Sequence, residues 1–221
     1  MLYIIATPIG NLEDISLRAL RILKEVDFIA CEDTRQTQKL CNAYNIQGKL
    51  ISYHQHSSRK KTDFILEKLE ENKSVAVVSD GGTPGISDPG CAIVRSAVDR
   101  GLPFTQLPGP SALIGALILS GFSTDGFLFL GFLPRKHGKI RKVLESSKML
   151  NKTTIFYESP FRIKKTLQIL REIFDDTLKV SIARELTKKF EEILRGPLEF
   201  VVEEIKNKEL KGECTVVFSQ E

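Results

Sequence analysis

The chain has 221 residues, of which 42% are hydrophobic and 27% are charged, and its formal net charge is +4. This composition fits a globular protein of one large domain or of two domains of about a hundred residues each. It excludes a membrane span, because the longest apolar stretch, 112–121, contains Gly115 and Ser120 and is shorter than the roughly twenty residues that a span requires. The N-terminus has no basic region before its apolar residues, so we expect no signal peptide and a cytoplasmic protein.

Apolar strand candidates alternate with amphipathic helix candidates along the first half of the chain, which is typical of an α/β protein. Strands are expected at 2–6, 28–31, 50–54, 75–79 and 104–107, and helices at 16–26, 63–71 and 91–100. The turn Pro108-Gly109-Pro110 then precedes an apolar helix, 111–120, which Ser111 is placed to cap.

The same alternation starts again in the second half. Strands are expected at 127–132, 153–157, 180–184, 190–194 and 214–218, and helices at 139–149, 162–174 and 198–206. The sequence therefore predicts two consecutive α/β domains of similar size, 1–115 and 116–221, with a boundary near 113–125.

The most informative segment is 79–90, which follows the buried-strand run 75–78 directly. Its four glycines permit positive φ and close backbone approach, and its two prolines fix φ. Asp80 and Asp88 add carboxylates that accept hydrogen bonds. An ordinary strand-to-helix turn needs only about three or four residues, and ligands bind at strand carboxyl ends in open α/β sheets. We interpret the segment as a binding loop.

Glycine-containing or polar segments follow four other predicted strands, at 7–11, 31–35, 157–162 and 183–187. The first matches neither GxGxxG nor a Walker loop. The second also fits an acidic helix N-terminus with Asp33 or Thr34 as the cap. Because such loops gather at strand carboxyl ends in both domains, we expect a ligand cleft between the domains.

Positive charge is concentrated in one stretch. Residues 1–115 carry 13 Lys or Arg and 13 Asp or Glu, whereas 134–165 has a net charge of +8. Its cations are Arg135, Lys136, Lys139, Arg141, Lys142, Lys148, Lys152, Arg162, Lys164 and Lys165. Such a run is most often a solvated helix face. Its place beside the apolar run 127–132 also indicates an anionic partner.

The cysteines and histidines give no metal signature. Cys31, Cys41, Cys91 and Cys214 contain no CxxC pair, which favours reduced, mostly buried thiols over disulfides or zinc. His54 and His56 alternate on an extended segment, but no third ligand accompanies them, so we expect no metal.

Seven segments, spread in order over nearly the whole chain, together resemble one family. They are ATPIGNLEDIS at 6–16, CEDTR at 31–35, SDGGTPGISDPG at 79–90, PGPSA at 108–112, FLGFLPRK at 129–136, YESPFR at 157–162 and RELTKKFEE at 184–192. The family is the small-subunit ribosomal RNA methyltransferase I family of the tetrapyrrole methylase superfamily, which 2′-O-methylates a cytidine in the decoding region. The resemblance implies two α/β domains of tetrapyrrole-methylase type, S-adenosylmethionine bound in the cleft between them, and a homodimer. Small-subunit ribosomal RNA, naked or in the assembled subunit, is the implied partner.

The resemblance also implies which residues line the cofactor site. Those of the first domain are Pro8, Gly10, Asp80, Gly81, Gly82, Thr83, Ile86, Ser87, Ser111 and Ala112, and those of the second are Tyr157, Glu158, Arg184 and Thr215. The chemistry fits, because Asp80 can accept bonds from the amino-acid or ribose part while Gly81 and Gly82 let the backbone meet the ligand. Carbonyls and carboxylates suit a cationic sulfonium.

The substrate side is implied to hold Asp33, Arg35, His54 and the basic stretch 134–142, with Arg135, Lys136, Lys139 and Arg141. Methyl transfer is an in-line displacement that requires neither a metal nor a covalent intermediate, and alignment alone can contribute up to ~7–11 kcal/mol. A base would help to remove the proton of the ribose hydroxyl. Asp33, His54 and Glu158 are the candidates, and the sequence does not choose among them.

Two other functions stay open. A methylase of tetrapyrroles or other small molecules in the same superfamily would share the cofactor loops, whereas CEDTR, YESPFR and the basic stretch favour RNA. A non-catalytic RNA-binding module would not bind S-adenosylmethionine.

Overall fold

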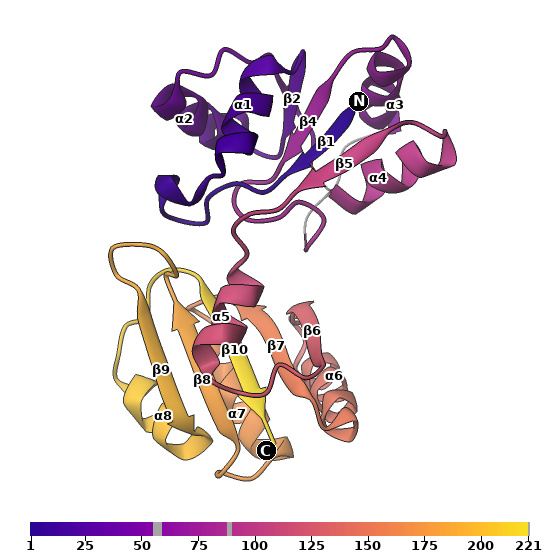
Figure 1. Ribbon diagram of the computed structural model, residues 1–221. Coiled ribbons are helices and arrows are strands. Elements are labelled where there is room, and N and C mark those ends of the chain that lie inside the picture. The colour runs from indigo at the N-terminus through magenta and orange to yellow at the C-terminus, as the bar shows by residue number, and fades with distance from the viewer. Residues whose placement is uncertain (55–58, 88–89, 221) are drawn as a thin grey trace. The chain divides into compact units, whose positions relative to one another are not determined.

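The computed structural model describes residues 1–54, 59–87 and 90–220 (Figure 1). The chain divides into two compact units, Met1–Ser111 and Ala112–Glu221. Each unit is built on a five-stranded sheet with helices packed against it. The division falls just before helix α5 (Ala112–Ser120), so the whole of this helix belongs to the second unit.

The sheet of the first unit is entirely parallel, with the strand order β3-β2-β4-β1-β5. Its strands are β1 (Leu2–Ile5), β2 (Phe28–Cys31), β3 (Leu50–Ser52), β4 (Val75–Val78) and β5 (Phe104–Leu107). Its helices are the 3-10 turn η1 (Leu12–Asp14), α1 (Leu17–Glu25), α2 (Thr34–Tyr44), α3 (Arg59–Glu70) and α4 (Gly90–Asp99).

Helices cover both faces of this sheet, and the central strand β4 shows the consequence. Val75 and Val77 belong to a hydrophobic cluster with α3 and α4, whereas Ala76 and Val78 belong to one with α1 and α2. A strand that is buried on both faces reads as a continuous apolar run rather than as an alternating one. This is why VAVV was recognisable in the sequence.

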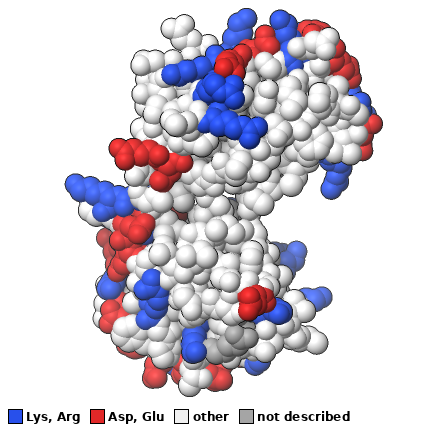
Figure 2. Space-filling view, in the orientation of Figure 1, with Lys and Arg blue, Asp and Glu red and all other residues white. Residues whose placement is uncertain are grey.

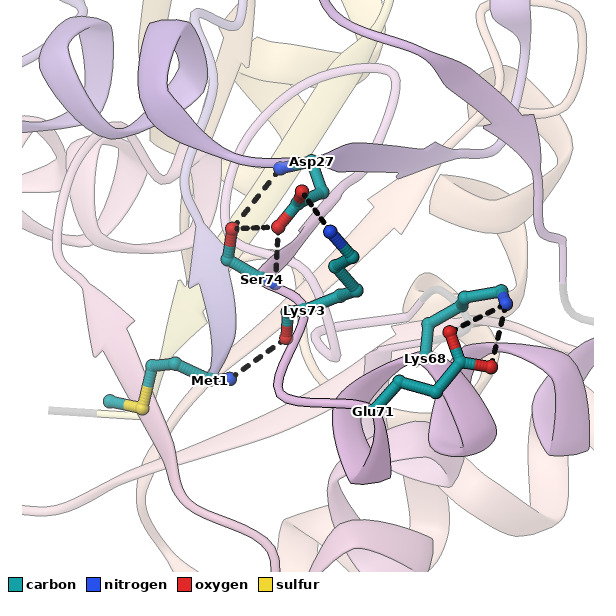
Figure 3. A network of polar contacts seen from close by, with 6 residues as sticks. All are labelled: Met1, Asp27, Lys68, Glu71, Lys73 and Ser74. Carbon is teal, nitrogen blue, oxygen red and sulfur yellow. Dashed lines mark hydrogen bonds and ion pairs between the residues drawn. The ribbon is translucent and has the colours of Figure 1, made fainter.

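A polar network fastens the amino ends of β2 and β4 (Figure 3). The Asp27 carboxylate accepts bonds from the backbone N–H and the hydroxyl of Ser74, at 2.8 and 2.9 Å. Lys73 Nζ lies 3.4 Å from the same carboxylate, and the amino group of Met1 donates to the Lys73 carbonyl at 3.1 Å. The bonds from Ser74 hold the pKa of Asp27 below its usual value. The network therefore joins the amino ends of β2 and β4 to each other and to the N-terminal residue.

The sheet of the second unit is mixed, with the order β6-β7-β10-β8-β9. Its strands are β6 (Phe127–Phe132), β7 (Thr153–Glu158), β8 (Lys179–Arg184), β9 (Glu192–Pro197) and β10 (Cys214–Ser219). Besides α5, its helices are α6 (His137–Leu150), α7 (Ile163–Ile173) and α8 (Leu198–Lys206). β6 and β7 are parallel, and the other pairs are antiparallel.

Helices α6, α7 and α8 share the main core of this unit, which includes Phe156 of β7. The opposite face is covered by α5, which packs mainly against β8 and β10. Because α5 is apolar around its whole circumference, its outer side leaves Ile114 and Ile118 exposed. Figure 2 shows few charged side chains over this helix.

A bulge at the end of β6 rearranges its aromatic side chains. Gly131 has φ of +62°, and the pairing with β7 gains one residue between Phe129 and Phe132. Residues three apart on a regular strand point to opposite faces, whereas a bulge brings them to the same side. Both rings accordingly contact Tyr157, with centroid distances of 5.0 and 5.3 Å.

Most expectations for the fold are confirmed, with differences at four elements. Helix α3 begins at Arg59, ahead of the expected 63, and β9 spans Glu192–Pro197 rather than 190–194. The α2 helix was expected only as a helix N-terminus after CEDTR, because its buried residues are few (Thr37, Leu40 and Cys41). Helix α6 starts at His137, ahead of the expected 139. The four thiols are free, and three of them are buried as expected, whereas Cys91 is exposed. In the described part of the chain, no helix combines the length and apolarity needed to cross a membrane.

Candidate functional site

The carboxyl ends of the parallel strands place the predicted ligand loops at one edge of the first sheet. The loops after β1, β2, β4 and β5 all begin there. Together with the first turn of α2, they carry Pro8, Gly10, Asp33, Arg35, Asp80, Gly81, Gly82, Thr83, Ile86, Ser87 and Ser111 of the predicted site. The structure therefore gathers these residues at one edge, as expected for a binding site in an open α/β sheet.

The loops after β1 and β4 are joined through their backbones. The N–H of Thr7 and the N–H of Gly82 each donate to the carbonyl of the other residue, both at 2.9 Å. The Thr7 hydroxyl also donates to the carbonyl of Ser79, at 3.1 Å. Gly82 has φ of +87°, and a Cβ on Gly81 would lie 3.2 Å from the Pro8 carbonyl oxygen. Glycine is therefore required by conformation at one position and by close approach at the other.

The loop after β5 joins the same junction. The hydroxyl of Thr83 donates to the carbonyl of Pro110 at 3.3 Å. A Cβ on Gly109 would lie only 2.9 Å from the Ala6 Cβ. We name the joined segments 6–8, 79–83 and 109–110 the glycine junction. Farther along the β4 loop, Ile86 is 40% exposed and Ser87 has φ of +71°.

Asp33 connects the loop after β2 to this junction. Its backbone N–H donates to the Asp80 carboxylate at 2.9 Å, and its side chain caps α2 by accepting a bond from the Arg35 N–H at 2.8 Å. The Arg35 guanidinium donates to both carboxylate oxygens, at 3.0 and 2.6 Å. These bonds from Arg35 lower the pKa of Asp33 to about 2. Asp33 is thus held as a carboxylate with a low proton affinity, and the helix-cap interpretation of CEDTR is confirmed.

Of the two histidines in the segment after β3, His54 lies within the described residues. His54 follows β3, at the same edge of the sheet, and is half-buried. His56 and Asp88 lie outside the described residues. Within 1–54, 59–87 and 90–220, no group of three or more His, Cys, Asp or Glu side chains is placed to hold a metal ion.

Glu158 of the second unit is 2% exposed and makes contacts within that unit. One carboxylate oxygen accepts a bond from the Ser159 N–H at 2.9 Å and lies 3.3 Å from Arg162 Nε. The other accepts a bond from the Thr166 hydroxyl at 2.7 Å. Both oxygens are therefore engaged, which suits a structural carboxylate better than a base.

The other predicted residues of the second unit lie on its sheet. Tyr157 and Thr215 are partners in the β7–β10 pairing, and Thr215 is buried. The Arg184 guanidinium pairs with Glu192 at 3.0 Å and donates to the Lys211 carbonyl at 3.0 Å. Their assignment to the cofactor stays a prediction. Ala112 begins α5.

The basic stretch separates into two kinds of cation. Arg141 pairs with Glu145 and Glu172, at 2.8 and 3.3 Å. Lys148, Lys152, Arg162 and Lys164 also donate to backbone carbonyls, of Ile173, Asp125, Pro134 and Lys206 respectively. By contrast, the exposed side chains of Arg135, Lys136 and Lys139 have no hydrogen-bond or ion-pair partner among the described residues. The solvated-face interpretation therefore holds only for part of the stretch.

Sequence reasoning missed several residues of the glycine junction. Thr7 and Ser79 supply its side-chain bonds, and Gly109 its closest approach. The signal for Gly109 was its position between two prolines at a strand end. Thr7 and Ser79 lie inside the predicted loops 7–11 and 79–90, but neither was singled out as a site residue.

Known proteins resemble this chain over nearly its whole length. A sequence profile of the family Tetrapyrrole (Corrin/Porphyrin) Methylases matches residues 1–201. The chain is 49% identical over 217 residues to ribosomal RNA small subunit methyltransferase I of Halalkalibacterium halodurans, covering 98% of this chain and 75% of that protein. With the protein of the same name from Thermotoga maritima, it shares 46% identity over 218 residues, covering 99% and 97%.

Among solved structures, uroporphyrin-III C-methyl transferase from Thermus thermophilus, complexed with S-adenyl homocysteine, matches with a TM-score of 0.68. The match covers 99% of this chain and 97% of that chain at 18% sequence identity. The likeness therefore establishes the fold.

Proposed function

This chain belongs to the tetrapyrrole methylase family and, within it, to the ribosomal RNA small subunit methyltransferase I proteins, and we propose that it methylates the 2′-hydroxyl of a cytidine ribose in small-subunit ribosomal RNA. The methyl donor is S-adenosylmethionine. Such a substrate places the enzyme in the cytoplasm, where it meets naked RNA or the assembled subunit.

The observation that carries the proposal is the glycine junction. Gly81 and Gly82 lack a Cβ where the chain approaches Pro8 and Thr7, so the loops after β1 and β4 pack closely and hold the exposed Asp80 at the carboxyl edge of the sheet. One oxygen of Asp80 accepts the Asp33 N–H, and the carboxylate can accept a further bond from an amino or hydroxyl donor. These groups fit the donor-rich amino-acid and ribose parts of S-adenosylmethionine. When bound, the cofactor would supply an activated methyl group on a cationic sulfonium.

The residues of this chain then have to align the ribose hydroxyl and accept its proton. Asp33 is an ionised carboxylate whose pKa is about 2, which suits it to orient a hydroxyl rather than to take its proton. Glu158 has both oxygens engaged in the second unit. We therefore propose His54, at the carboxyl edge of the first sheet, as the base.

The RNA side of the proposal rests on charge. Arg135, Lys136 and Lys139 are exposed and have no partner in the described part of the chain, so their charges are available to phosphates. Arg35 is also exposed, but it is paired with Asp33. RNA phosphates would compete for this guanidinium.

A homodimer is part of the proposal, with α5 as its contact. Ile114 and Ile118 are 47% and 64% exposed on a helix that carries no charged residue. A second copy offers the same apolar surface, as a two-fold interface requires. Ile118→Lys should then produce monomers at micromolar concentration in sedimentation. If the parent chain is itself monomeric there, the dimer is wrong.

The proposed function is tested by methyl transfer in vitro. The purified chain is incubated with S-adenosylmethionine carrying a labelled methyl group, and with deproteinised small-subunit RNA or with assembled subunits. We expect label in the ribose of a cytidine for at least one of the two substrates. Label transferred to a tetrapyrrole and to neither RNA substrate would instead support a small-molecule methylase.

A further inference from the structure

The loop after β7 carries an aromatic side chain that the proposed function does not use. Phe161, in the segment YESPFR, is 92% exposed. A single exposed apolar side chain needs no explanation. The hydrogen bonds that fix this loop, and the basic segment to which they join it, indicate a role for Phe161.

The buried carboxylate of Glu158, at the end of β7, fixes this loop. This carboxylate binds the Ser159 N–H and the Arg162 guanidinium. The Ser159 hydroxyl accepts a bond from the Phe161 N–H at 3.3 Å, and the Ser159 carbonyl accepts one from the Arg162 N–H at 2.9 Å. The backbone of Phe161 is therefore held in place while its ring stays in solvent. Glu158 is a positioning residue for this loop.

Arg162 joins the same loop to the basic segment that follows β6. Its guanidinium donates to the carbonyls of Leu133 and Pro134, at 3.1 and 2.7 Å. These residues directly precede Arg135 and Lys136, two of the exposed cations without a partner in the described chain. Because β6 and β7 are parallel, both loops leave the sheet at the same edge. The exposed ring and the exposed cations are thus kept at one edge of one unit.

A third loop at this edge also carries an exposed aromatic ring beside a cation. β7 and β8 are each antiparallel to β10, so they run in the same direction and the loop after β8 leaves at the edge of Phe161. In this loop Phe190 is 66% exposed, with Lys189 Nζ 5.7 Å from its ring centroid. Glu185 and Thr187 hold left-handed φ angles of +52° and +63°. Such strained backbone is concentrated at binding sites and other functional positions.

We propose that this edge binds unpaired bases of the substrate RNA, with a base stacked on Phe161 and the neighbouring phosphates on Arg135 and Lys136. The inference rests on the proposed function, since it names how that substrate is held. Exposed aromatic rings interleaved with cations are the pattern by which proteins bind single-stranded RNA. A protein partner would favour a continuous apolar surface, whereas exposed cations share this edge with the two rings.

Stacking requires a free base face, so the ring should discriminate single strands from duplexes. Phe161→Leu keeps an apolar side chain but removes the aromatic face. We expect it to bind a single-stranded oligoribonucleotide of mixed sequence roughly 5- to 100-fold more weakly than the parent. Affinity for the matched duplex, affinity for S-adenosylmethionine and the salt dependence of RNA binding should not change. Phe161→Tyr, which keeps an aromatic ring, should restore binding.

The matched control is Phe200→Leu. Phe200 is also exposed, at 48%, but it lies on α8 away from this edge, and its replacement should leave RNA affinity at the parent value. Parent-like affinity of Phe161→Leu for the single strand would overturn the inference. A change in self-association without a change in RNA affinity would also overturn it, in favour of a protein-binding surface. Failure of the proposed function is recognised separately, because the parent chain would then not methylate RNA, whatever the RNA affinities of the variants.

Discussion

Replacing Gly82 with alanine tests whether the glycine junction binds the cofactor. A Cβ at this position would lie 3.4 Å from Ile9 Cγ2 and 3.8 Å from the Pro110 carbonyl oxygen, which are ordinary contacts. The cost is conformational, because φ is +87° and an L-residue in the left-handed region loses about 1–2 kcal/mol. The backbone can relieve this strain only by disturbing the two bonds that Gly82 makes with Thr7.

If the relaxed backbone has to return to its original conformation when S-adenosylmethionine binds, the same free energy is lost from binding. Affinity should then fall about 5- to 30-fold, as measured by calorimetry. Gly101→Ala is the matched control, since Gly101 has φ of +64° and nothing within 4 Å of an added Cβ, and it follows α4 at the opposite edge of the sheet. Both variants should lose similar stability in thermal melts. Equal cofactor affinity in the two variants would refute the assignment.

Three further predictions concern charged side chains. Glu158→Ala should lower the free energy of unfolding by about 3 kcal/mol in urea titrations, because it leaves buried partners unpaired; parent-like stability would contradict the structural role. Lys136→Gln should reduce the magnitude of the salt slope of single-stranded RNA binding by roughly 0.7. Arg141→Gln should leave the slope unchanged, because its cation is already paired with two glutamates. Equal slopes in the two variants would contradict this division of the basic stretch. The folded-state pKa of Asp33 is about 2 against an ordinary value of 3.8, so the stability that its carboxylate contributes is present above pH 3.8 and is lost as the pH falls toward 2. Arg35→Ala should remove this contribution, as measured by thermal melts at a series of pH values. The same fall in melting temperature between pH 3.8 and 2 in the variant and the parent would refute the prediction.

The sequence predicted the first unit well where a local pattern carried the structure. A continuous apolar run followed by glycines and prolines located both β4 and its loop. The α2 helix was expected only at its N-terminus, because few of its residues, Thr37, Leu40 and Cys41, are buried. Glycine within FLFLGF is the kind of residue that marks a bulge, but its effect on Phe129 and Phe132 depends on the partner strand.

Side-chain roles were harder to predict, because they depend on contacts between distant residues. Glu158 stood at a strand end like a ligand-binding carboxylate, and its burial depends on Thr166 and Arg162 of the following helix region. Arg141 was assigned to the substrate, but Glu172, thirty-one residues later, pairs with it. The low pKa of Asp33, in contrast, arises from Arg35 two residues away, and the motif CEDTR contains both partners.

We propose that this chain methylates a cytidine ribose in small-subunit ribosomal RNA. Mass-spectrometric mapping of ribose methylation in that RNA, from cells with the gene, without it and with it restored, tests this proposal. We expect one 2′-O-methylcytidine to disappear without the gene and to return when the parent gene is restored. An identical methylation map in all three cell lines would contradict the proposal.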